Sequence, residues 1–434
     1  MRWARTSSKI WGNTVEDLLL LVHRIPYPPN KGDKIRSWHL LRHLAARYRV
    51  HLATFVDDPD DWQYVANVRQ LCASSHFAPL NPTRARLRSL RALLANRALS
   101  LDYYSDRSTR TWVQRTMRDA GIERVVVFSS PMAQYMHDVP GVRRVVDLCD
   151  VDSEKWRAYA DKKSWPASLL YGYEANRLLR YEREVAANSD AALFVSAPEA
   201  ALFRTLAPES ASRIGWFGNG VDTVYFSPDA VHANPYPSGE NALVFCGAMD
   251  YWPNVDAVQW FAHEVLPLLR ARMPHTSFFI VGARPAPEVQ ALANLPGVTV
   301  TGTVPDVRPY VAHAALSVAP LRVARGIQNK VLEAMSMGKA VVVSPQALEG
   351  IDAAAGSEVL LAEHATDVAN TIVAALSDGV LRAALGRAAR ARIEASYGWD
   401  ARLAPLDALL EAPRQPAGTT HLQAAVPSPT WNQA

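Results

Sequence analysis

The chain has 434 residues and a formal net charge of +4, with 49% hydrophobic and 20% charged residues. This composition is that of a globular α/β protein long enough for two or three domains, and it argues against a disordered chain. No basic stripe interleaved with aromatic residues is present, which argues against a nucleic-acid partner.

Positive charge is concentrated in the first half: residues 1–200 carry 30 Lys and Arg against 22 Asp and Glu, and residues 201–434 carry 16 against 20. This asymmetry predicts two domains with different surfaces. The three cysteines lie far apart, which is typical of a reducing cytoplasm. No run reaches the roughly 20 apolar residues of a membrane span, so we expect a cytoplasmic protein, soluble or peripheral on the inner face of the cell membrane.

In the first half, apolar runs alternate with helical patterns, which predicts a parallel sheet. A strand over Asp17–Arg24 leads through a Pro-rich loop with Gly32 and Asp33 into a helix near Ile35–Arg47. The aspartate run at 57–61 is interpreted as a solvated loop. Further strands are expected at Val50–Val56, Val125–Phe128, Val145–Leu148 and Ala191–Val195.

The second half repeats this alternation, so the predicted fold class is α/β with two facing Rossmann-like, doubly wound domains and a ligand at the carboxyl edges of the strands. Its strands are expected at Ala242–Gly247, Ser277–Val281, Val298–Thr301, Leu316–Ala319 and Ala340–Val343. The expected division is a frayed extension at 1–16, a first domain at 17–215, a hinge at 216–240, a second domain at 241–398, a crossover helix at 399–412 and a disordered tail at 413–434.

The segment from Pro320 to Val343 is the most informative about chemistry. A strand ends, a loop with Gly326 turns, and a short helix carries Lys330 in its first turn and Glu333 on the same face. The start of a helix favours an anion. A cation beside that start, followed by a carboxylate one turn on, predicts a nucleotide-diphosphate site, with the diphosphate near Lys330 and the ribose near Glu333.

Several motifs then follow one another along the chain. They are Val195-Ser196-Ala197-Pro198-Glu199, Asn219-Gly220-Val221-Asp222, Phe245-Cys246-Gly247, Val300-Thr301-Gly302-Thr303-Val304 and Val331-Leu332-Glu333-Ala334-Met335. With these motifs the chain resembles the retaining, nucleotide-sugar-dependent glycosyltransferases of the GT-B fold, family 4, over roughly residues 17–410.

A narrower resemblance is to the sugar transferases associated with PEP-CTERM/exosortase exopolysaccharide loci. It rests on three segments: 26–36, 150–156 and Gly326-Ile327-Gln328-Asn329-Lys330. The resemblance implies a hexosyltransferase-type reaction with retention, no cofactor and no metal. It places the donor at Gly247, Val304, Gly326, Asn329 and Glu333.

The chain departs from the family pattern in two places. Arg325 stands where the family has its first Glu, and the family's Arg and Lys after Gly247 are missing. We therefore assign the diphosphate charge, and the catalytic role, to Arg325 and Lys330.

The first domain is expected to hold the acceptor, an oligosaccharide or a lipid-linked sugar. Gly32, Asp33, Asp150 and Asp152 are the candidates; helix capping is the alternative for the last two, and His23 is interpreted as structural.

Arg84, Arg88 and Arg91 fall on one predicted helical face beside leucines. They indicate either a solvated helix packed by those leucines or a contact with an anionic membrane surface. Two rival functions stay open: a GT-B nucleotide-sugar epimerase, and a non-catalytic scaffold that binds nucleotide-sugar or polysaccharide.

Overall fold

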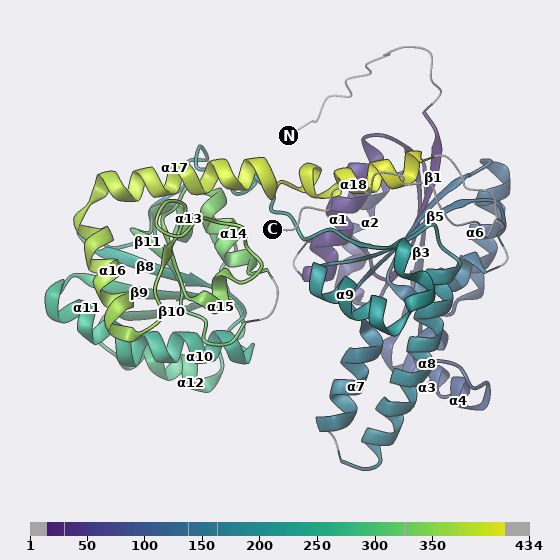
Figure 1. Ribbon diagram of the computed structural model, residues 1–434, viewed down its shortest axis with the longest axis horizontal. Helices are drawn as coiled ribbons and strands as arrows, with labels where there is room; N and C mark the ends of the chain where they lie inside the picture. The colour runs from purple at the N-terminus through teal and green to yellow at the C-terminus, as the bar shows by residue number, and fades with distance from the viewer. Residues whose placement is uncertain (1–14, 30, 138, 163, 325–326, 413–434) are drawn as a thin grey trace. The chain divides into compact units, whose positions relative to one another are not determined.

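The computed structural model describes residues 15–412 except 30, 138, 163 and 325–326. The chain divides into two compact units (Figure 1). Unit 1 comprises the residues up to Gly218 together with the segment from Leu403, and unit 2 spans Asn219–Arg402. The extension and tail expected at the two ends lie outside the described residues, apart from positions 15 and 16.

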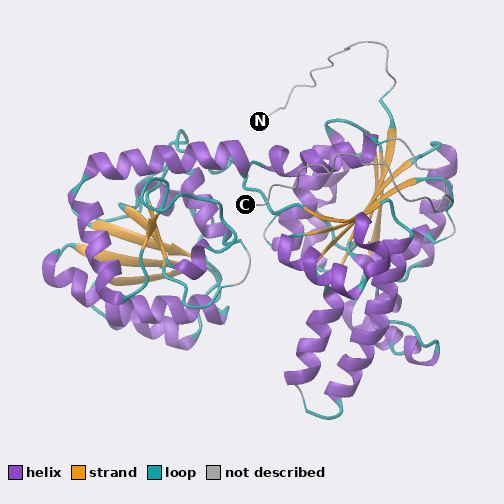
Figure 2. Cartoon of the chain, viewed as in Figure 1, coloured by secondary structure: helices purple, strands orange, loops and turns teal. Residues whose placement is uncertain are grey.

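Unit 1 is built on a seven-stranded parallel sheet in the order β3-β2-β1-β4-β5-β6-β7. Leu18 to Val22, in the interior strand β1, are fully buried because helices cover both faces of the sheet (Figure 2). The strands are β1 Asp17–Val22, β2 Arg49–Val56, β3 Ser74–Pro79, β4 Arg124–Phe128, β5 Arg143–Cys149, β6 Ala191–Phe194 and β7 Ile214–Trp216.

The helices of unit 1 connect these parallel strands. The first begins at Gly32, three residues before the predicted start, because Lys31 is already in an extended, N-cap conformation. The helices are α1 Gly32–Ala45, α2 Val65–Arg69, α3 Pro82–Ser89, α4 Arg91–Leu94, α5 Leu99–Tyr103, α6 Arg107–Asp119, α7 Asp152–Lys162, α8 Ala167–Ala187 and α9 Ala197–Leu206, with 3-10 turns at Pro59–Tyr64, Ser130–Met136 and Pro208–Arg213.

Unit 2 has a six-stranded parallel sheet in the order β10-β9-β8-β11-β12-β13. Its strands are β8 Asn241–Cys246, β9 Thr276–Val281, β10 Val298–Gly302, β11 Leu316–Ala319, β12 Val341–Val343 and β13 Leu360–Leu361. Its helices are α10 Trp252–Trp260, α11 Leu266–Arg272, α12 Pro287–Ala291, α13 Arg308–His313, α14 Asn329–Ser336, α15 Pro345–Leu348, α16 Ala365–Ser377 and α17 Gly379–Ser396, with a π turn at Phe261–Val265 and a 3-10 turn at Leu292–Asn294.

The last described helix, α18 Trp399–Glu411, starts in unit 2, and its residues from Leu403 pack in unit 1. There Asp407 Oδ1 accepts a hydrogen bond from His43 Nε2 at 2.8 Å, and the Leu409 carbonyl accepts one from Arg143 Nε at 2.7 Å. Among the described helices none alone is long and apolar enough to cross a membrane; only α16 and α17, bent by 103°, pass that test as a pair.

Candidate functional site

The carboxyl edge of the unit 2 sheet brings the predicted donor residues together. Gly247 directly follows β8, and its N–H donates to the Val281 carbonyl of β9. Asn329 and Lys330 are the first two residues of α14, and Glu333 lies one turn further along. The helix buries Val331, Leu332, Ala334 and Met335 against the sheet, and Lys330 and Glu333 lie on its other face, where both are partly buried.

Lys330 is held in place by a partner that the sequence did not reveal. Its Nζ donates to Asn254 Oδ1 at 2.6 Å and lies 4.6 Å from the ring centroid of Phe245. Asn254, on α10, is buried and donates through Nδ2 to the Ala248 carbonyl at 2.8 Å. The ammonium is thus fixed beside Gly247 at the end of β8.

Burial shifts the pKa values of the two ionisable groups of α14, Lys330 and Glu333, away from their ordinary values. Desolvation lowers the pKa of Lys330 to about 8, against the attraction of Glu333. Desolvation likewise raises the pKa of Glu333 to about 7, against the attraction of Lys330. A bound diphosphate would raise the pKa of Lys330 again, because a nearby anion favours the charged ammonium.

A second patch of unit 2 lies along the β10–α13 loop. Val304 packs beside the cluster that contains Phe279 and Val281. Arg308, which the sequence did not single out, pairs with Asp306 at 2.6 Å and stacks 3.7 Å from the ring centroid of Tyr225. Arg325 and Gly326, the remaining donor candidates, lie outside the described residues.

Among the donor candidates that the structure describes, Gly247 is the one whose lack of a side chain has a spatial reason. A Cβ there would lie 2.8 Å from Asn254 Nδ2 and 3.5 Å from Lys330 Cε. Replacing Gly247 by alanine should therefore displace Asn254 and weaken nucleotide binding about tenfold, or roughly 1.4 kcal/mol. Calorimetric titration would measure it, with Gly379→Ala as control because a Cβ there meets only Arg382 Nη2, at 3.7 Å. Equal affinity of both variants would contradict the assignment.

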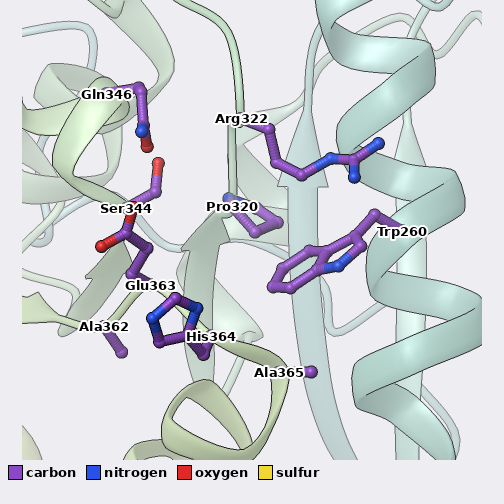
Figure 3. Close-up of a pocket in the computed structure, with 9 residues that line it drawn as sticks. All are labelled: Trp260, Pro320, Arg322, Ser344, Gln346, Ala362, Glu363, His364 and Ala365. Atoms are coloured by element: carbon purple, nitrogen blue, oxygen red, sulfur yellow. The ribbon is translucent and has the colours of Figure 1, made fainter.

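A cavity of about 280 Å³ opens elsewhere at the carboxyl edge of the same sheet (Figure 3). It is lined by Trp260, Pro320, Arg322, Ser344, Gln346, Ala362, Glu363, His364 and Ala365. Arg322 is already paired with Asp256, with Nε 2.9 Å from Oδ2. None of the described donor candidates lines this cavity, so it is a feature distinct from the Lys330 site.

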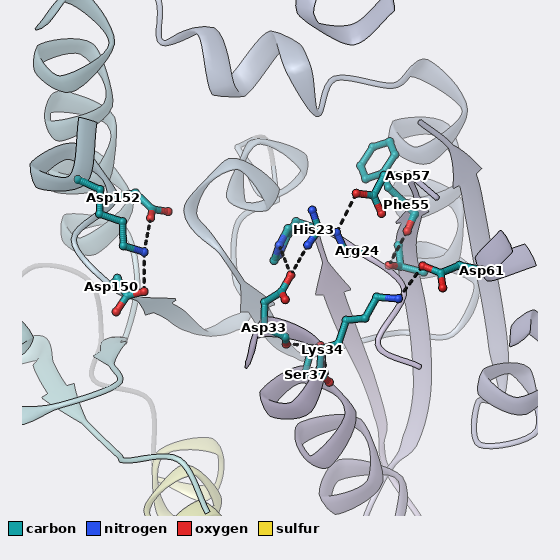
Figure 4. A network of polar contacts seen from close by, with 12 residues as sticks. His23, Arg24, Asp33, Lys34, Ser37, Phe55, Asp57, Asp61, Asp150 and Asp152 are labelled. Carbon is teal, nitrogen blue, oxygen red and sulfur yellow. Dashed lines mark hydrogen bonds and ion pairs between the residues drawn. The ribbon is translucent and has the colours of Figure 1, made fainter. Parts of the chain in front are cut away.

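The carboxyl edge of the unit 1 sheet carries a charged network (Figure 4). Arg24, just after β1, contacts Asp57 at 2.9 Å and Asp33 at 2.7 Å. His23 Nε2 lies 3.4 Å from the same Asp33 carboxylate, and its ring stacks on Phe128. Although partial burial opposes it, the hydrogen bond from His23 and the charge of Arg24 hold the pKa of Asp33 well below its usual range.

Three buried polar atoms at this edge have no hydrogen-bond partner among the described residues: His23 Nδ1, Asp57 Oδ1 and Ser130 Oγ. They follow β1, β2 and β4, which are neighbours in the sheet. Buried polar atoms are normally satisfied, so unsatisfied ones indicate places for a ligand's hydroxyl groups or water. The sequence pointed to Asp33 of this network, but it did not reveal His23 and Asp57, because His23 was interpreted as structural and residues 57–61 as solvated.

The interpretation of residues 57–61 as a solvated loop was wrong for two of them. Asp57 is paired with Arg24, and Asp61 is buried and accepts from Lys34 Nζ at 2.6 Å. Each carboxylate has a cation partner that lies far away in the sequence.

The other acceptor-side candidates occupy two places. Gly32 is the first residue of α1, beside Asp33, and a Cβ added to it would meet no atom within 4 Å. Asp150 and Asp152 lie apart from the His23 network, at the start of α7, where Lys155 Nζ donates to both, at 2.6 Å and 3.1 Å (Figure 4). Their carboxylates remain about one-third exposed. No group of three or more His, Cys, Asp or Glu side chains is arranged to hold a metal ion within the described part of the chain.

The prediction of one helical face for Arg84, Arg88 and Arg91 was wrong. The helix breaks after Ser89, so Arg91 belongs to α4. Arg88 donates to the Asp102 and Tyr103 carbonyls at 3.0 Å and 2.7 Å, which occupies it structurally.

Comparison with known proteins bears on the fold and on the domain that contains Lys330 and Glu333. Residues 240–378 match the family Glycosyl transferases group 1. No curated protein matches the chain. Both units together have the GT-B fold predicted from the sequence, and that prediction is confirmed by solved structures.

Three such structures are sucrose-phosphate synthase from Thermosynechococcus elongatus (18% identity, 91% of this chain and 98% of that chain, TM-score 0.61), Anabaena HepE in complex with UDP (14%, 91% and 100%, 0.57), and WaaG, a glycosyltransferase involved in lipopolysaccharide biosynthesis (18%, 90% and 98%, 0.56).

Proposed function

We propose that this GT-B chain with a glycosyl transferases group 1 domain is a retaining, hexosyl-type glycosyltransferase that uses a nucleotide-diphospho-sugar. Its acceptor is a growing exopolysaccharide or a polyprenyl-linked sugar, as in the PEP-CTERM/exosortase-associated transferases it resembles. The observation that carries the proposal is the position of Lys330 and Glu333 at the start of α14, beside Gly247, within that domain. On this proposal the enzyme works in the cytoplasm, peripheral on the inner face of the membrane.

The donor roles follow from charge and position. Lys330, Arg325 and the loop at Gly326 neutralise the leaving diphosphate, and charges placed on a leaving group stabilise the transition state. Glu333 accepts hydrogen bonds from the ribose hydroxyls, while Asn329 and the Val304 backbone face the nucleoside. That HepE was solved with UDP supports a nucleotide donor for this fold. Protein cations do the work of a metal on this proposal, and no cofactor takes part.

The acceptor is assigned to unit 1. Asp33, Gly32 and the unsatisfied atoms of His23, Asp57 and Ser130 provide hydrogen-bonding capacity for a sugar. Asp150 and Asp152 contribute a second acidic contact from the start of α7.

The test is a thermal-shift screen against UDP, GDP, TDP, ADP and their sugar conjugates in the presence of EDTA. A ligand at about a hundred times its dissociation constant adds roughly 2.7 kcal/mol of stability. A shift with one nucleotide, followed by transfer with retained anomeric configuration, supports the proposal. A free epimerised nucleotide-sugar as product would favour the epimerase, and binding without any turnover would favour a scaffold.

Donor affinity should depend on pH through Glu333. Its pKa of about 7 means that it is mostly neutral at pH 6 and ionised at pH 8. The ionised carboxylate accepts stronger hydrogen bonds from the ribose hydroxyls than the protonated acid does, so affinity for the nucleotide-sugar should rise with pH relative to Glu333→Gln. The nucleotide-sugar is used because a terminal phosphate itself titrates near pH 6. A wild-type to variant affinity ratio that stays constant across this range contradicts the ribose role.

The His23 ring offers a test of the acceptor site. Replacing His23 by phenylalanine keeps the stacking on Phe128 but removes both ring nitrogens. We expect the KM for the acceptor to rise about tenfold, because the variant loses one hydrogen bond to a charged or buried polar group. Hydrolysis of the donor in the absence of acceptor should be unchanged. An unchanged acceptor KM would remove His23 from the site.

A further inference from the structure

A row of leucines on α3 and α4 faces solvent instead of the core. Leu94 is 93% exposed and Leu87 is 66% exposed, and Leu90 and Leu93 also lie at the surface. Only Ala85, Ser89 and Ala92 of this segment are buried, so small residues make its packing contacts. The expectation that the leucines pack the helix onto the domain was therefore wrong, and they form an apolar surface that nothing in unit 1 covers.

A second exposed apolar group lies at the tip of the α7–α8 hairpin. Trp165, in the turn, is 76% exposed, and Leu169, in the first turn of α8, is 65% exposed. Figure 1 shows this hairpin extending from unit 1, with α3 and α4 beside α8. The Tyr173 hydroxyl of α8 donates to the Ala92 and Arg97 carbonyls at 3.4 Å and 3.3 Å, which ties the two elements together.

The surface around these side chains is positively charged. Between Pro82 and Ala98 the sequence has five arginines and no Asp or Glu. Arg84, Arg86 and Arg91 are exposed, and none of them forms an ion pair within the described residues. Arg88 and Arg97 are occupied, the first by the two carbonyls of α5 and the second by Asp102 at 3.0 Å.

We propose that α3, α4 and the α7–α8 tip form a docking surface for an anionic lipid bilayer. Trp and Leu side chains enter the interfacial region, and arginines beside them pair with acidic headgroups. A second copy of this chain fits less well, because its own arginine-rich segment would meet the first.

This inference deepens the proposed function, on which its purpose rests: docking would deliver the enzyme to a lipid-linked acceptor. Vesicle binding needs neither donor nor acceptor, so the two proposals can fail separately. A chain that binds vesicles but transfers no sugar overturns the function and keeps the docking surface. If the chain transfers sugar but does not bind vesicles, only the proposed docking surface is refuted.

The experiment is cosedimentation of the full chain with vesicles of phosphatidylcholine, alone or mixed with phosphatidylglycerol. Binding to the mixed vesicles is expected, with weakening when salt is raised from about 0.1 M to about 1 M, since the Debye length falls from about 10 Å to about 3 Å. Arg84→Glu with Arg91→Glu should weaken it at least about 25-fold, at about fivefold for each arginine lost. Trp165→Ser with Leu169→Ser should weaken it about as strongly.

Matched controls come from unit 2, where Val380 is 80% exposed and Arg387 is exposed on the same helix, α17. Val380→Ser and Arg387→Glu should bind vesicles like the wild type. Hydrogen exchange on vesicles should slow in α3, α4 and the start of α8. Equal binding of all variants, or none by the wild type, overturns the proposal. So does a dimer in analytical ultracentrifugation that the α3–α4 and hairpin substitutions dissociate, which would assign the surface to a second copy.

Discussion

Replacing Lys330 by methionine should lower the rate of sugar transfer about a hundredfold to a thousandfold without unfolding the protein. The Lys330 ammonium lies at the start of α14, where the proposal places the leaving diphosphate. Removing one group that stabilises the charge developing in a transition state typically lowers kcat about a hundredfold to a thousandfold. The fold should tolerate the change, because desolvation already disfavours the charge, with a pKa lowered to about 8. Steady-state kinetics with the donor chosen by thermal shift would measure it.

Lys339 supplies the matched control for this experiment. Desolvation lowers its pKa to about 8 as well, but it follows α14 and contributes nothing to the proposed donor site. Lys339→Met should therefore keep the wild-type rate. Near-normal rates in both Lys330→Met and Arg325→Ala would refute the assignment of the diphosphate charge.

The arginine variant adds a signature in pH. The wild-type kcat/KM for the donor should fall as pH rises above about 8, because Lys330 of the free enzyme then loses its proton. Arginine stays charged throughout this range, so Lys330→Arg should lack that fall even if its rate is lower. A fall at the same pH in both proteins would show that another group titrates.

Of the substitutions proposed for this protein, Arg36→Met should lower the free energy of unfolding the most. Arg36 and Asp147 are 1% and 2% exposed, and they form two hydrogen bonds of 2.7 Å and 3.1 Å. The guanidinium also donates to the Phe217 carbonyl at 3.1 Å and stacks 3.8 Å from the Phe217 ring. Removing it leaves a buried carboxylate without its charge partner, which costs about 3–5 kcal/mol.

Calorimetry should show the transition of unit 1 lowered by roughly 10 °C, at about 2–4 °C per kcal/mol for a unit of this size. The double variant Arg36→Met with Asp147→Leu should recover most of the loss, since it buries no lone charge. It should not recover all of it, because Asp147 also accepts from the Cys149 N–H at 3.1 Å. Arg183→Met, which breaks an exposed pair with Glu209, should leave the transition almost unchanged. A small effect of Arg36→Met would mean that water reaches Asp147.

The fold was predictable because strands buried on both faces read as continuous apolar runs. Leu18–Val22 and Val125–Phe128 are such runs, and both are central strands. Strand β3, with the sequence Ser-Ser-His-Phe-Ala-Pro, has no such run and lies at the edge of the sheet, so it was not predicted. The break between α3 and α4 could not be predicted from the spacing of the arginines either.

Apart from Gly247, which the family resemblance placed at the donor site, the site was predictable only where its residues are neighbours in sequence. Lys330 and Glu333 share one helix, so helical spacing alone places them together. Asn254 reaches Lys330 from a helix 76 residues away. His23, Asp57 and Ser130 follow three different strands, and the strand order that makes them neighbours is not readable from a single sequence.

Helix α18 imposes an order on the folding of the two units. Leu403, Leu406 and Leu410 are almost fully buried in unit 1, although they are separated from the rest of it by all of unit 2. Unit 2 is continuous in sequence and can fold once it has left the ribosome. Unit 1 is translated first but must wait for the last helix to cover its apolar surface. The half of the chain that is made first is therefore the half that finishes folding last.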